Sequence, residues 1–426
     1  MASRRDFLKL AGAFVAGLAV GGAAGYYSAP GAAQPKPTPT PAAKRIKAGW
    51  IYVGPIGDYG WTHAHDIGRK ESEKAFPWLE TVYVENIDEA KCEGAIEEFI
   101  DKGCTVIFTT SFDHMKPTYR AAEKHPDILF FHCSGYMRRP NMATYFADFY
   151  QIYYLNGLMA GALTKSNILG YVAAHLIPEV IRHINAFAIG ALEVNPNVKV
   201  YVIRIGRWYW PEMAREAART LVEMGADVLA FTEDSPATIE FAQSYYKEKG
   251  RKIPVFSHYS PMYEFGPDVV VSGQVVRWGT IYKDILAKVY AGMYTNTNLE
   301  NVDYWCLLNS GAVDVGGKTY EDKLWINPAY EEVFSRITVT EKYTGARMSL
   351  LDLIKLRYSQ MSDPNPTFDP FTGPLRGRWW LSIPGTCLGR EYKPGEEVSV
   401  PPGVRLGHDD LWNMGWFLEN VVVQKK

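Results

Sequence analysis

Aromatic rings and short polar side chains follow one predicted strand after another in this chain. Residues 54–62 read Gly-Pro-Ile-Gly-Asp-Tyr-Gly-Trp-Thr and come directly after a predicted strand at 48–53. Asp58 and Trp61 stand at the start of the helix predicted next, where an Asp also serves as a common N-cap and a Trp also serves in ordinary packing. A flat indole face beside a carboxylate suits a flat ligand with hydrogen-bonding groups at its rim.

The same kinds of residue recur after four later predicted strands, at 105–109, 199–205, 227–232 and 255–257. They are Thr110, Ser111, Phe112, Trp208, Asp234, Ser235 and His258. Ligands of open parallel sheets bind beyond the carboxyl ends of the strands, so we expect these side chains to face one binding site. A planar guest between Trp61 and Trp208 suits this pattern, and purines and sugars both stay open as ligands.

Two series of alternating strands and helices are expected to position these residues. The first has strands at 48–53, 80–84, 105–109 and 128–132, with helices at 61–75, 89–102 and 118–124. A long apolar helix at 151–164 leads to the second, which has strands at 169–173, 199–205, 227–232, 255–257 and 269–275 and helices at 179–195, 211–225, 236–250 and 278–293. Such alternation predicts an α/β protein with two doubly wound, Rossmann-like lobes joined by a hinge.

We expect lobe 1 to comprise residues 46–150 plus 258–305, and lobe 2 to comprise residues 151–257 plus 306–345, because the chain exceeds a single typical core. Residues 346–426 are expected to form an extension that wraps over the lobes, with helices at 350–361 and 411–417.

The N-terminus carries the features of an export signal. Residues 3–9 read Ser-Arg-Arg-Asp-Phe-Leu-Lys and precede an apolar run at 10–20, which is typical of a twin-arginine leader. Residues 1–33 form this signal, and both cleavage and retention as a membrane anchor stay open. Residues 34–45 are rich in Pro and Thr and predict a stiff linker. The protein is therefore expected outside the cytoplasm, at the cell surface or anchored to a membrane.

Charge and cysteine content exclude some classes of function. The formal net charge is -2, and the leader holds three basic residues against one acidic residue, so the remainder is more acidic still. No nucleic-acid partner is expected. The five cysteines are scattered and show no Cys-x-x-Cys spacing, so we expect no metal site and no cofactor, while one or two disulfides stay open.

The chain resembles the basic membrane protein family, the PnrA-like substrate-binding proteins of ABC transporters. The resemblance rests on residues 52–62 and 107–112 and extends to 177–187, 234–235, 278–279 and 368–374. It implies a type I periplasmic binding protein fold that closes on a purine base or a nucleoside. It also implies delivery of this ligand to an ABC permease, and we expect a monomer.

The resemblance also implies roles for single residues. Trp61 and Trp208 correspond to ring platforms, while Asp58, Ser111 and Asp234 correspond to polar contacts.

One departure from the family pattern concerns a late strand. Relatives carry Val-Val-Asp-Glu-Trp-Gly where residues 274–279 here read Gln-Val-Val-Arg-Trp-Gly. Val276 offers no acceptor to an N–H edge, so a ribose is either absent, different, or held by Gln274, His258 or Glu179. Free base, nucleoside and other flat heterocycles all stay open.

Two alternative functions remain. A secreted nucleoside hydrolase would use paired carboxylates, which Asp58, Asp113, Glu179, Glu233 and Asp234 supply, but the chain has no Gly-x-Ser-x-Gly elbow and no phosphate loop. A ligand-sensing receptor without a transport role needs only the same closing cleft. In every binding role, a ligand that contacts both lobes favours the closed form.

Overall fold

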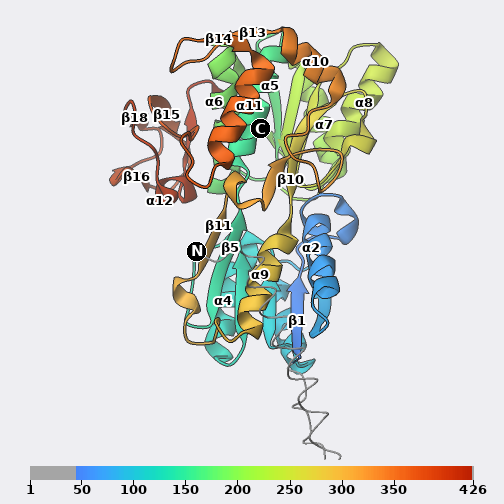
Figure 1. Cartoon of the computed structure of the whole chain (residues 1–426), viewed down its shortest axis with the longest axis vertical. Helices are drawn as coiled ribbons and strands as arrows, with labels where there is room; N and C mark the ends of the chain where they lie inside the picture. The colour runs from blue at the N-terminus through green and yellow to red at the C-terminus, as the bar shows by residue number, and fades with distance from the viewer. Residues whose placement is uncertain (1–44, 425–426) are drawn as a thin grey trace, which may run out of the picture. The chain divides into compact units, whose positions relative to one another are not determined.

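The computed structural model describes residues 45–424. These residues belong to one compact unit that begins at Arg45, shown in Figure 1. The predicted twin-arginine leader, the possible membrane anchor and all but the last residue of the predicted linker lie outside the described residues.

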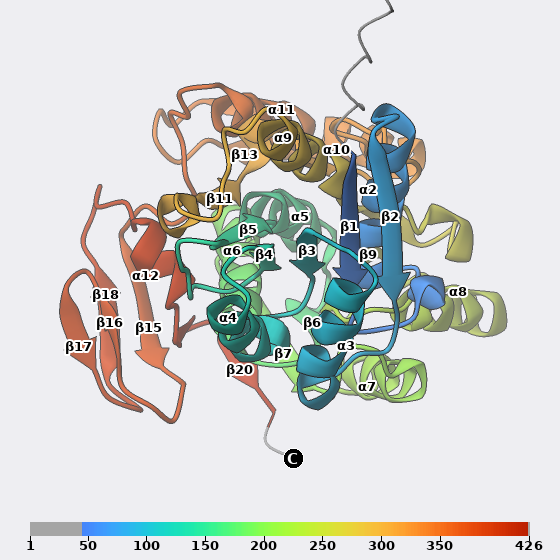
Figure 2. The same ribbon diagram turned by 90° about the horizontal axis from the view of Figure 1, so that it is seen from below.

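Lobe 1 is built on a six-stranded sheet in the order β11-β5-β4-β3-β1-β2, and every pairing in it is parallel. Its strands are β1 (Ile46–Ile51), β2 (Leu79–Val84), β3 (Val106–Thr109), β4 (Leu129–Cys133), β5 (Met142–Ala147) and β11 (Asp303–Cys306). Its helices are α2 (Trp61–Ala75), α3 (Glu89–Asp101), α4 (Met115–Lys124) and α9 (Trp278–Tyr290). Helices α2 and α9 lie on one side of the sheet, and α3 and α4 lie on the other (Figure 2). The central strands are accordingly buried on both faces.

Lobe 2 is built on a seven-stranded sheet in the order β12-β10-β9-β8-β6-β7-β20, in which only β12 runs antiparallel to its neighbour. Its strands are β6 (Ile168–Ala173), β7 (Lys199–Arg204), β8 (Val228–Thr232), β9 (Val255–Ser257), β10 (Val270–Val276), β12 (Val313–Val315) and β20 (Val421–Val423). Its helices are α5 (Tyr150–Leu163), α6 (Pro178–Val194), α7 (Pro211–Glu223) and α8 (Ala237–Lys249). The two lobes confirm the predicted fold class.

Helices α5 and α6 pack at backbone contact. A Cβ at Gly157 would lie 2.1 Å from the carbonyl oxygen of Phe187, and one at Gly190 would lie 2.0 Å from that of Tyr154. Any larger side chain at either position would push the helices apart. Helix α5 is apolar nearly all round and buried along most of its length, as expected for a helix inside a core.

The chain crosses between the lobes three times, after β5, after β10 and after β11. The predicted return to lobe 1 at residue 258 is wrong, because β10 pairs in parallel with β9 and completes the lobe 2 sheet before the crossing at Arg277. Helix α9 and strand β11 then belong to lobe 1, as expected. Strands β5 and β11, which pair with each other, had no counterpart among the predicted strands.

The C-terminal extension, described for residues 346–424, follows α10 (Pro328–Arg336) and β13 (Thr338–Thr340). It contains β14 (Arg347–Ser349), α11 (Leu350–Ser362), β15 (Leu375–Trp379), β16 (Gly385–Cys387), β17 (Arg390–Tyr392), β18 (Glu397–Val400), α12 (His408–Trp412), β19 (Trp416–Leu418) and β20. The predicted helix at 350–361 is confirmed. The predicted helix at 411–417 is wrong, because α12 ends at Trp412 and the next residues pair as β19 with β15.

The extension is fastened to lobe 2 by α6 as well as by β20. The side-chain amide of Asn185 donates to the carbonyl oxygen of Trp416 at 2.8 Å and accepts from the backbone N–H of Leu418 at 3.0 Å. These bonds provide partners for one carbonyl oxygen and one N–H group of β19, and they hold the extension against lobe 2.

Candidate functional site

A cavity lies between the two lobes, where the carboxyl ends of several strands meet. It holds about 280 Å³ of space between its atoms, part of it open to solvent. Its lining consists of Val53, Trp61, Ser111, Phe112, Ser134, Glu179, Trp208, Asp234 and Tyr259. The structure therefore brings together six of the residues predicted from the sequence, namely Trp61, Ser111, Phe112, Glu179, Trp208 and Asp234.

Trp61, at the start of α2, forms a fixed wall from lobe 1. Its side chain is 6% exposed, and its indole N–H donates to the carbonyl oxygen of Thr110 at 2.6 Å. The rings of Tyr259 and Trp278 meet it edge-on with centroids 5.1 and 5.2 Å away. One hydrogen bond and two edge contacts thus hold the ring in a single orientation.

Trp208 contributes an aromatic wall from lobe 2. It follows β7 in a loop that is tied to the next strand end, because its carbonyl oxygen accepts from the backbone N–H of Asp234 at 2.8 Å. Its half-buried ring contacts His175 at a centroid distance of 5.0 Å. Trp208 has fewer neighbours of this kind than Trp61, so it has more freedom to adjust to a guest.

Asp234 brings an unpaired acceptor to the cavity. It is 2% exposed, and its Oδ1 has no hydrogen-bond partner among residues 45–424. Burial raises the pKa of Asp234 well above its usual range, and the charges of Asp58, Glu233 and Glu179 raise it further. A buried acceptor without a partner is costly, and a ligand N–H group would remove that cost.

Glu179, in the first turn of α6, is the second carboxylate of the cavity. Its Oε2 accepts from the Ser134 hydroxyl at 2.8 Å, a bond that joins lobe 2 to lobe 1. Burial raises the pKa of Glu179 to about 7, against the opposing effects of Ser134 and Arg182. Among the nine described residues of the lining, none is Lys or Arg. The cavity therefore suits a neutral or donor-rich guest better than an anion.

Asp58 lies outside the lining, contrary to the expectation that it contacts a ligand. Its carboxylate accepts from the backbone N–H groups of Gly60, Thr62 and His63 at 2.7, 3.0 and 3.0 Å. Asp58 thus shapes the loop and caps α2, which is the ordinary role of an Asp at this position. Burial nevertheless raises the pKa of Asp58 to about 7, although the three backbone bonds oppose this shift.

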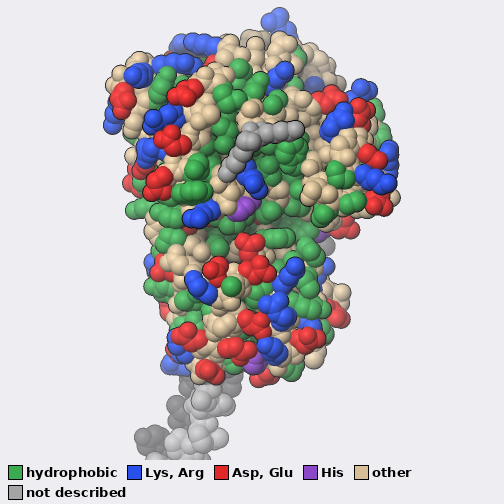
Figure 3. Space-filling view, turned by 180° about the vertical axis from the view of Figure 1, so that it is seen from behind, with side chains coloured by type: hydrophobic (Ala, Val, Ile, Leu, Met, Phe, Trp, Pro, Cys, Tyr) green, Lys and Arg blue, Asp and Glu red, His purple; other side chains and the backbone are tan. Residues whose placement is uncertain are grey.

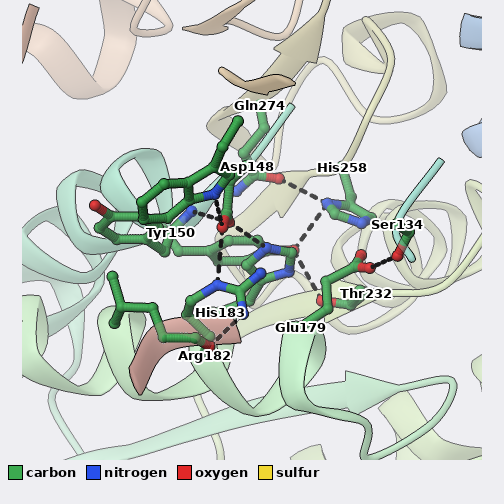
Figure 4. Close-up of polar contacts among 12 residues, drawn as sticks. Ser134, Asp148, Tyr150, Glu179, Arg182, His183, Thr232, His258 and Gln274 are labelled. Carbon is green, nitrogen blue, oxygen red and sulfur yellow. Dashed lines mark hydrogen bonds and ion pairs between the residues drawn. The ribbon is translucent and has the colours of Figure 1, made fainter. Parts of the chain in front are cut away.

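Four further predicted residues lie behind the cavity lining. Thr110 donates through its hydroxyl to the carbonyl oxygen of Ile51 at 2.9 Å, and Ser235 donates to Glu233 at 2.7 Å. His258 and Gln274 are fully buried and contact each other, with Nδ1 of His258 3.0 Å from Oε1 of Gln274 (Figure 4). All four side chains are buried inside the lobes, and none of them lines the cavity.

Val53, Ser134 and Tyr259 line the cavity but were not among the predicted site residues. Ser134 directly follows β4, and Tyr259 follows β9 by two positions, so the strand-end rule applied to both. Both adopt left-handed backbone conformations, with φ of 68° and 61°. Such conformations cost about 1–3 kcal/mol in non-glycine residues and gather at functional sites. The strand-end rule marks both positions, but no local sequence pattern indicates the left-handed backbone conformations with which Ser134 and Tyr259 line the cavity.

A buried ion pair joins the lobes beside the cavity. Asp148 follows β5 in lobe 1, and its carboxylate lies 2.9 Å from Nε of Arg182 and 3.3 Å from Nε2 of His183, both on α6 (Figure 4). Trp305 of β11 donates to the same carboxylate at 2.9 Å. Burial raises the pKa of Asp148, but Arg182 and His183 outweigh it and hold this pKa below its usual range.

Several other features of residues 45–424 bear on function. In this range we find no helix with the length and apolar character that a membrane crossing requires. The same residues contain no group of His, Cys, Asp and Glu side chains suited to a metal ion. The five cysteines, all within this range, are free thiols. On the face shown in Figure 3, acidic and basic side chains are interspersed and form no basic stripe.

Comparison with known proteins places these observations in a family. A model of the family described as PnrA-like ABC transporter substrate-binding proteins matches residues 45–332. A purine-binding protein of Brucella abortus is 38% identical over 260 residues, which cover 61% of this chain and 73% of that protein. A Haloferax volcanii protein, provisionally named as the glucose-binding protein of an ABC transporter, is 34% identical over 297 residues, covering 70% and 71%.

A solved structure supports the fold at lower identity. The solute-binding protein of an ABC transporter from Aeropyrum pernix has a TM-score of 0.58 at 16% identity. The match covers 74% of this chain and 85% of that protein. This likeness shows the two-lobed fold of type I periplasmic binding proteins.

Proposed function

Since this chain belongs to the PnrA-like family of ABC transporter substrate-binding proteins, we propose that it captures a purine base or a nucleoside between its lobes and delivers it to an ABC permease. The observation that carries this proposal is the composition of the interlobe cavity. Trp61 of lobe 1 and Trp208 of lobe 2 line the same space, next to the unpaired carboxylate oxygen of Asp234.

A purine matches both the indole rings and the carboxylate oxygens that line the cavity. Its flat faces stack on indole rings, and each stacked ring contact contributes about 1–3 kcal/mol. Its N–H edge donates to Asp234 or Glu179, and hydrogen bonds to such groups contribute about 1–3 kcal/mol each. The purine-binding relative from Brucella abortus supports this ligand class.

Glucose is a second candidate, because a relative carries a provisional name as a glucose-binding protein. Hexose hydroxyls both donate and accept, so a hexose needs polar partners around its whole rim. Four of the nine lining residues are aromatic and come from both lobes, namely Trp61, Phe112, Trp208 and Tyr259. Four others are polar, and two of these, Ser134 and Glu179, already bond each other. The cavity thus favours a flat heterocycle over a hexose.

Closure around the ligand is the proposed mechanism. In this structure the lobes already touch, because the Ser260 hydroxyl donates to the carbonyl oxygen of Gly60 at 3.1 Å and Ser134 donates to Glu179. A ligand that contacts both indoles adds to these contacts only in the closed form and therefore increases its population. A permease that recognises the closed form then receives loaded protein.

We further propose that residues 3–9 direct export and that the protein works outside the cytoplasm as a monomer without catalytic activity. Binding alone accounts for the cavity. The buried carboxylates lie near aromatic walls and a helix start, and the proposed role uses them as acceptors.

Extraction of the full chain with denaturant, followed by mass spectrometry of any released molecule, tests the ligand class. Calorimetric titration with adenine, guanine, adenosine, guanosine and glucose complements it. We expect micromolar or tighter binding of at least one purine compound and none of glucose. Tight binding of glucose alone, or of none of the five, would overturn the proposal.

Two further experiments test the alternative functions. Release of free base from adenosine or guanosine by the pure protein would indicate a nucleoside hydrolase, and we expect none. A sensing receptor would bind the same ligand, but deletion of its gene would leave uptake of labelled purine unchanged. We expect deletion to reduce this uptake.

A further inference from the structure

A second cavity opens beside the first, between both lobes and the C-terminal extension. It holds about 390 Å³ between its atoms, part of it open to solvent. Lobe 1, lobe 2 and the extension contribute its lining in turn: Phe112, Ser134 and Tyr136; Ile177, Pro178, Glu179 and Arg182; Trp412 and Asn413. Phe112, Ser134 and Glu179 also line the first cavity, so the two spaces are adjoining compartments of one cleft.

The end of α12 is fixed at this position by both lobes. Arg182 of α6 donates through Nη1 to the carbonyl oxygen of Leu411 at 2.6 Å, and its guanidinium lies 5.5 Å from the Trp412 ring centre. Trp412 also meets Phe146 of lobe 1 edge-on at 5.5 Å. Trp412 and Asn413 lie beyond residue 332, where the match to the family model ends.

The two compartments are continuous through shared lining residues. Phe112, Ser134 and Glu179 line both, and the second compartment continues from Glu179 to Trp412 and Asn413. A substituent on a base in the first compartment would therefore extend past Glu179 into the second.

The polar groups of the second compartment suit hydroxyls. Glu179 uses only one of its carboxylate oxygens to accept from Ser134. The exposed amide of Asn413 donates one N–H to the carbonyl oxygen of Asp409 at 2.9 Å, which leaves its oxygen and its second N–H for a ligand. A phosphate would need an unpaired cation. The one cation in the described lining, Arg182, is already paired with Asp148 at 2.9 Å.

We propose that the C-terminal extension builds a second subsite, in which Trp412 and Asn413 receive an uncharged, hydroxylated substituent, such as a ribose, attached to the planar ligand. The proposal rests on the proposed function of the first compartment. Trp412 supplies an apolar face, while Glu179, Ser134 and Asn413 supply hydrogen bonds. Ligands with such a substituent bind more tightly than the free base, and phosphorylated ligands bind more weakly.

Calorimetric titration of the full chain with adenine, adenosine and adenosine monophosphate tests this subsite. We expect the wild-type protein to bind adenosine at least tenfold more tightly than adenine and to bind the monophosphate least. Trp412→Ala should weaken adenosine binding at least tenfold and adenine binding less than threefold. Asn413→Ala should weaken adenosine binding about threefold to tenfold. Because Asn413 is exposed, this second variant tests the subsite even where loss of Trp412 loosens the extension.

Trp380→Ala serves as the matched control, because this Trp of the extension is 41% exposed and lines neither compartment. Equal losses for adenine and adenosine in both variants, or no loss in either, would overturn the subsite. Absence of binding of any purine compound to the wild-type protein would instead overturn the proposed function.

Discussion

The backbone of Gly60 in lobe 1 lies directly against the backbone of Asp234 in lobe 2. A Cβ at Gly60 would lie 2.8 Å from the Cα of Asp234, a distance that real Cβ atoms essentially never show. Only glycine allows the loop after β1 and the loop after β8 to meet in this way. The same contact brings Asp234 beside the cavity wall formed by Trp61, which follows Gly60 directly.

Gly60→Ala is expected to hinder closure, because its methyl group would collide with the Asp234 backbone. The affinity for the purine ligand should fall at least tenfold in calorimetric titration, and small-angle scattering with ligand should show a more open protein. Gly57→Ala is the matched control, since a Cβ at the exposed Gly57 meets nothing within 4 Å. Unchanged affinity in Gly60→Ala would mean that the ligand binds without this interlobe contact.

Trp208→Ala should weaken ligand binding by tenfold or more, which corresponds to about 1.4 kcal/mol, because one of the two stacking faces is removed. The temperature of unfolding should change little, since the ring is only half-buried. Titration calorimetry and differential scanning calorimetry measure the two effects, with Trp380→Ala as the control. An affinity equal to that of the wild type would remove Trp208 from the site.

Glu179→Gln should change how stability depends on pH. Burial raises the pKa of Glu179 from 4.5 to about 7, so the folded protein holds this proton more tightly than the unfolded chain. The wild type therefore loses stability as pH rises from about 4.5 to 7, by up to ~1.4 kcal/mol per pH unit, and the Gln variant does not. The free energy of unfolding of the variant minus that of the wild type should increase over this range and then level off.

Denaturant unfolding at several pH values measures this difference. Glu248→Gln, at an exposed position of α8, is the control and should show a constant difference across the range. A flat difference for Glu179→Gln as well would show that the carboxyl is not held protonated by the fold.

Asp148→Asn should destabilise the protein by about 3–5 kcal/mol, because it leaves the buried charge of Arg182 without its partner. Replacement of both residues, Asp148→Asn with Arg182→Met, should recover part of this loss. Glu98→Gln breaks an exposed pair with Lys102, whose side chains are 60% and 50% exposed, and should cost about 1 kcal/mol or less. Denaturant unfolding checks all three, and equal losses for Asp148→Asn and Glu98→Gln would contradict the role of the buried pair.

The position of the site relative to the strands could be predicted from local pattern. Trp61, Ser111, Phe112, Trp208 and Asp234 all follow predicted strands, and the structure places them in one cavity. Alternation of apolar strands with amphipathic helices requires parallel sheets covered on both faces, and parallel sheets gather their carboxyl ends at one edge. The fold class and the sheet edge at which a ligand binds follow from this requirement together with the family resemblance.

Side-chain direction at those strand ends required the tertiary structure. Asp58 turns to the start of α2, and His258 turns to Gln274 inside lobe 2, whereas Ser134 and Tyr259 enter the cavity through left-handed backbone conformations. Which way each residue turns depends on neighbours contributed by distant parts of the chain. Sequence distance carries no information about those neighbours.

For the strands, too, local pattern predicted where each one lies in the sequence, whereas the tertiary structure decided to which lobe it belongs. The existence of β10 was evident from its run of apolar residues, but its place in lobe 2 depends on pairing with β9 and β12. The second compartment depends on α12, and Asn185 and Arg182 of α6 help to hold the extension that carries this helix against lobe 2. Local pattern thus determined the elements and the sheet edge at which a ligand binds. Strand pairing and buried polar contacts decided which side chains meet at that edge, because these interactions join residues far apart in the chain.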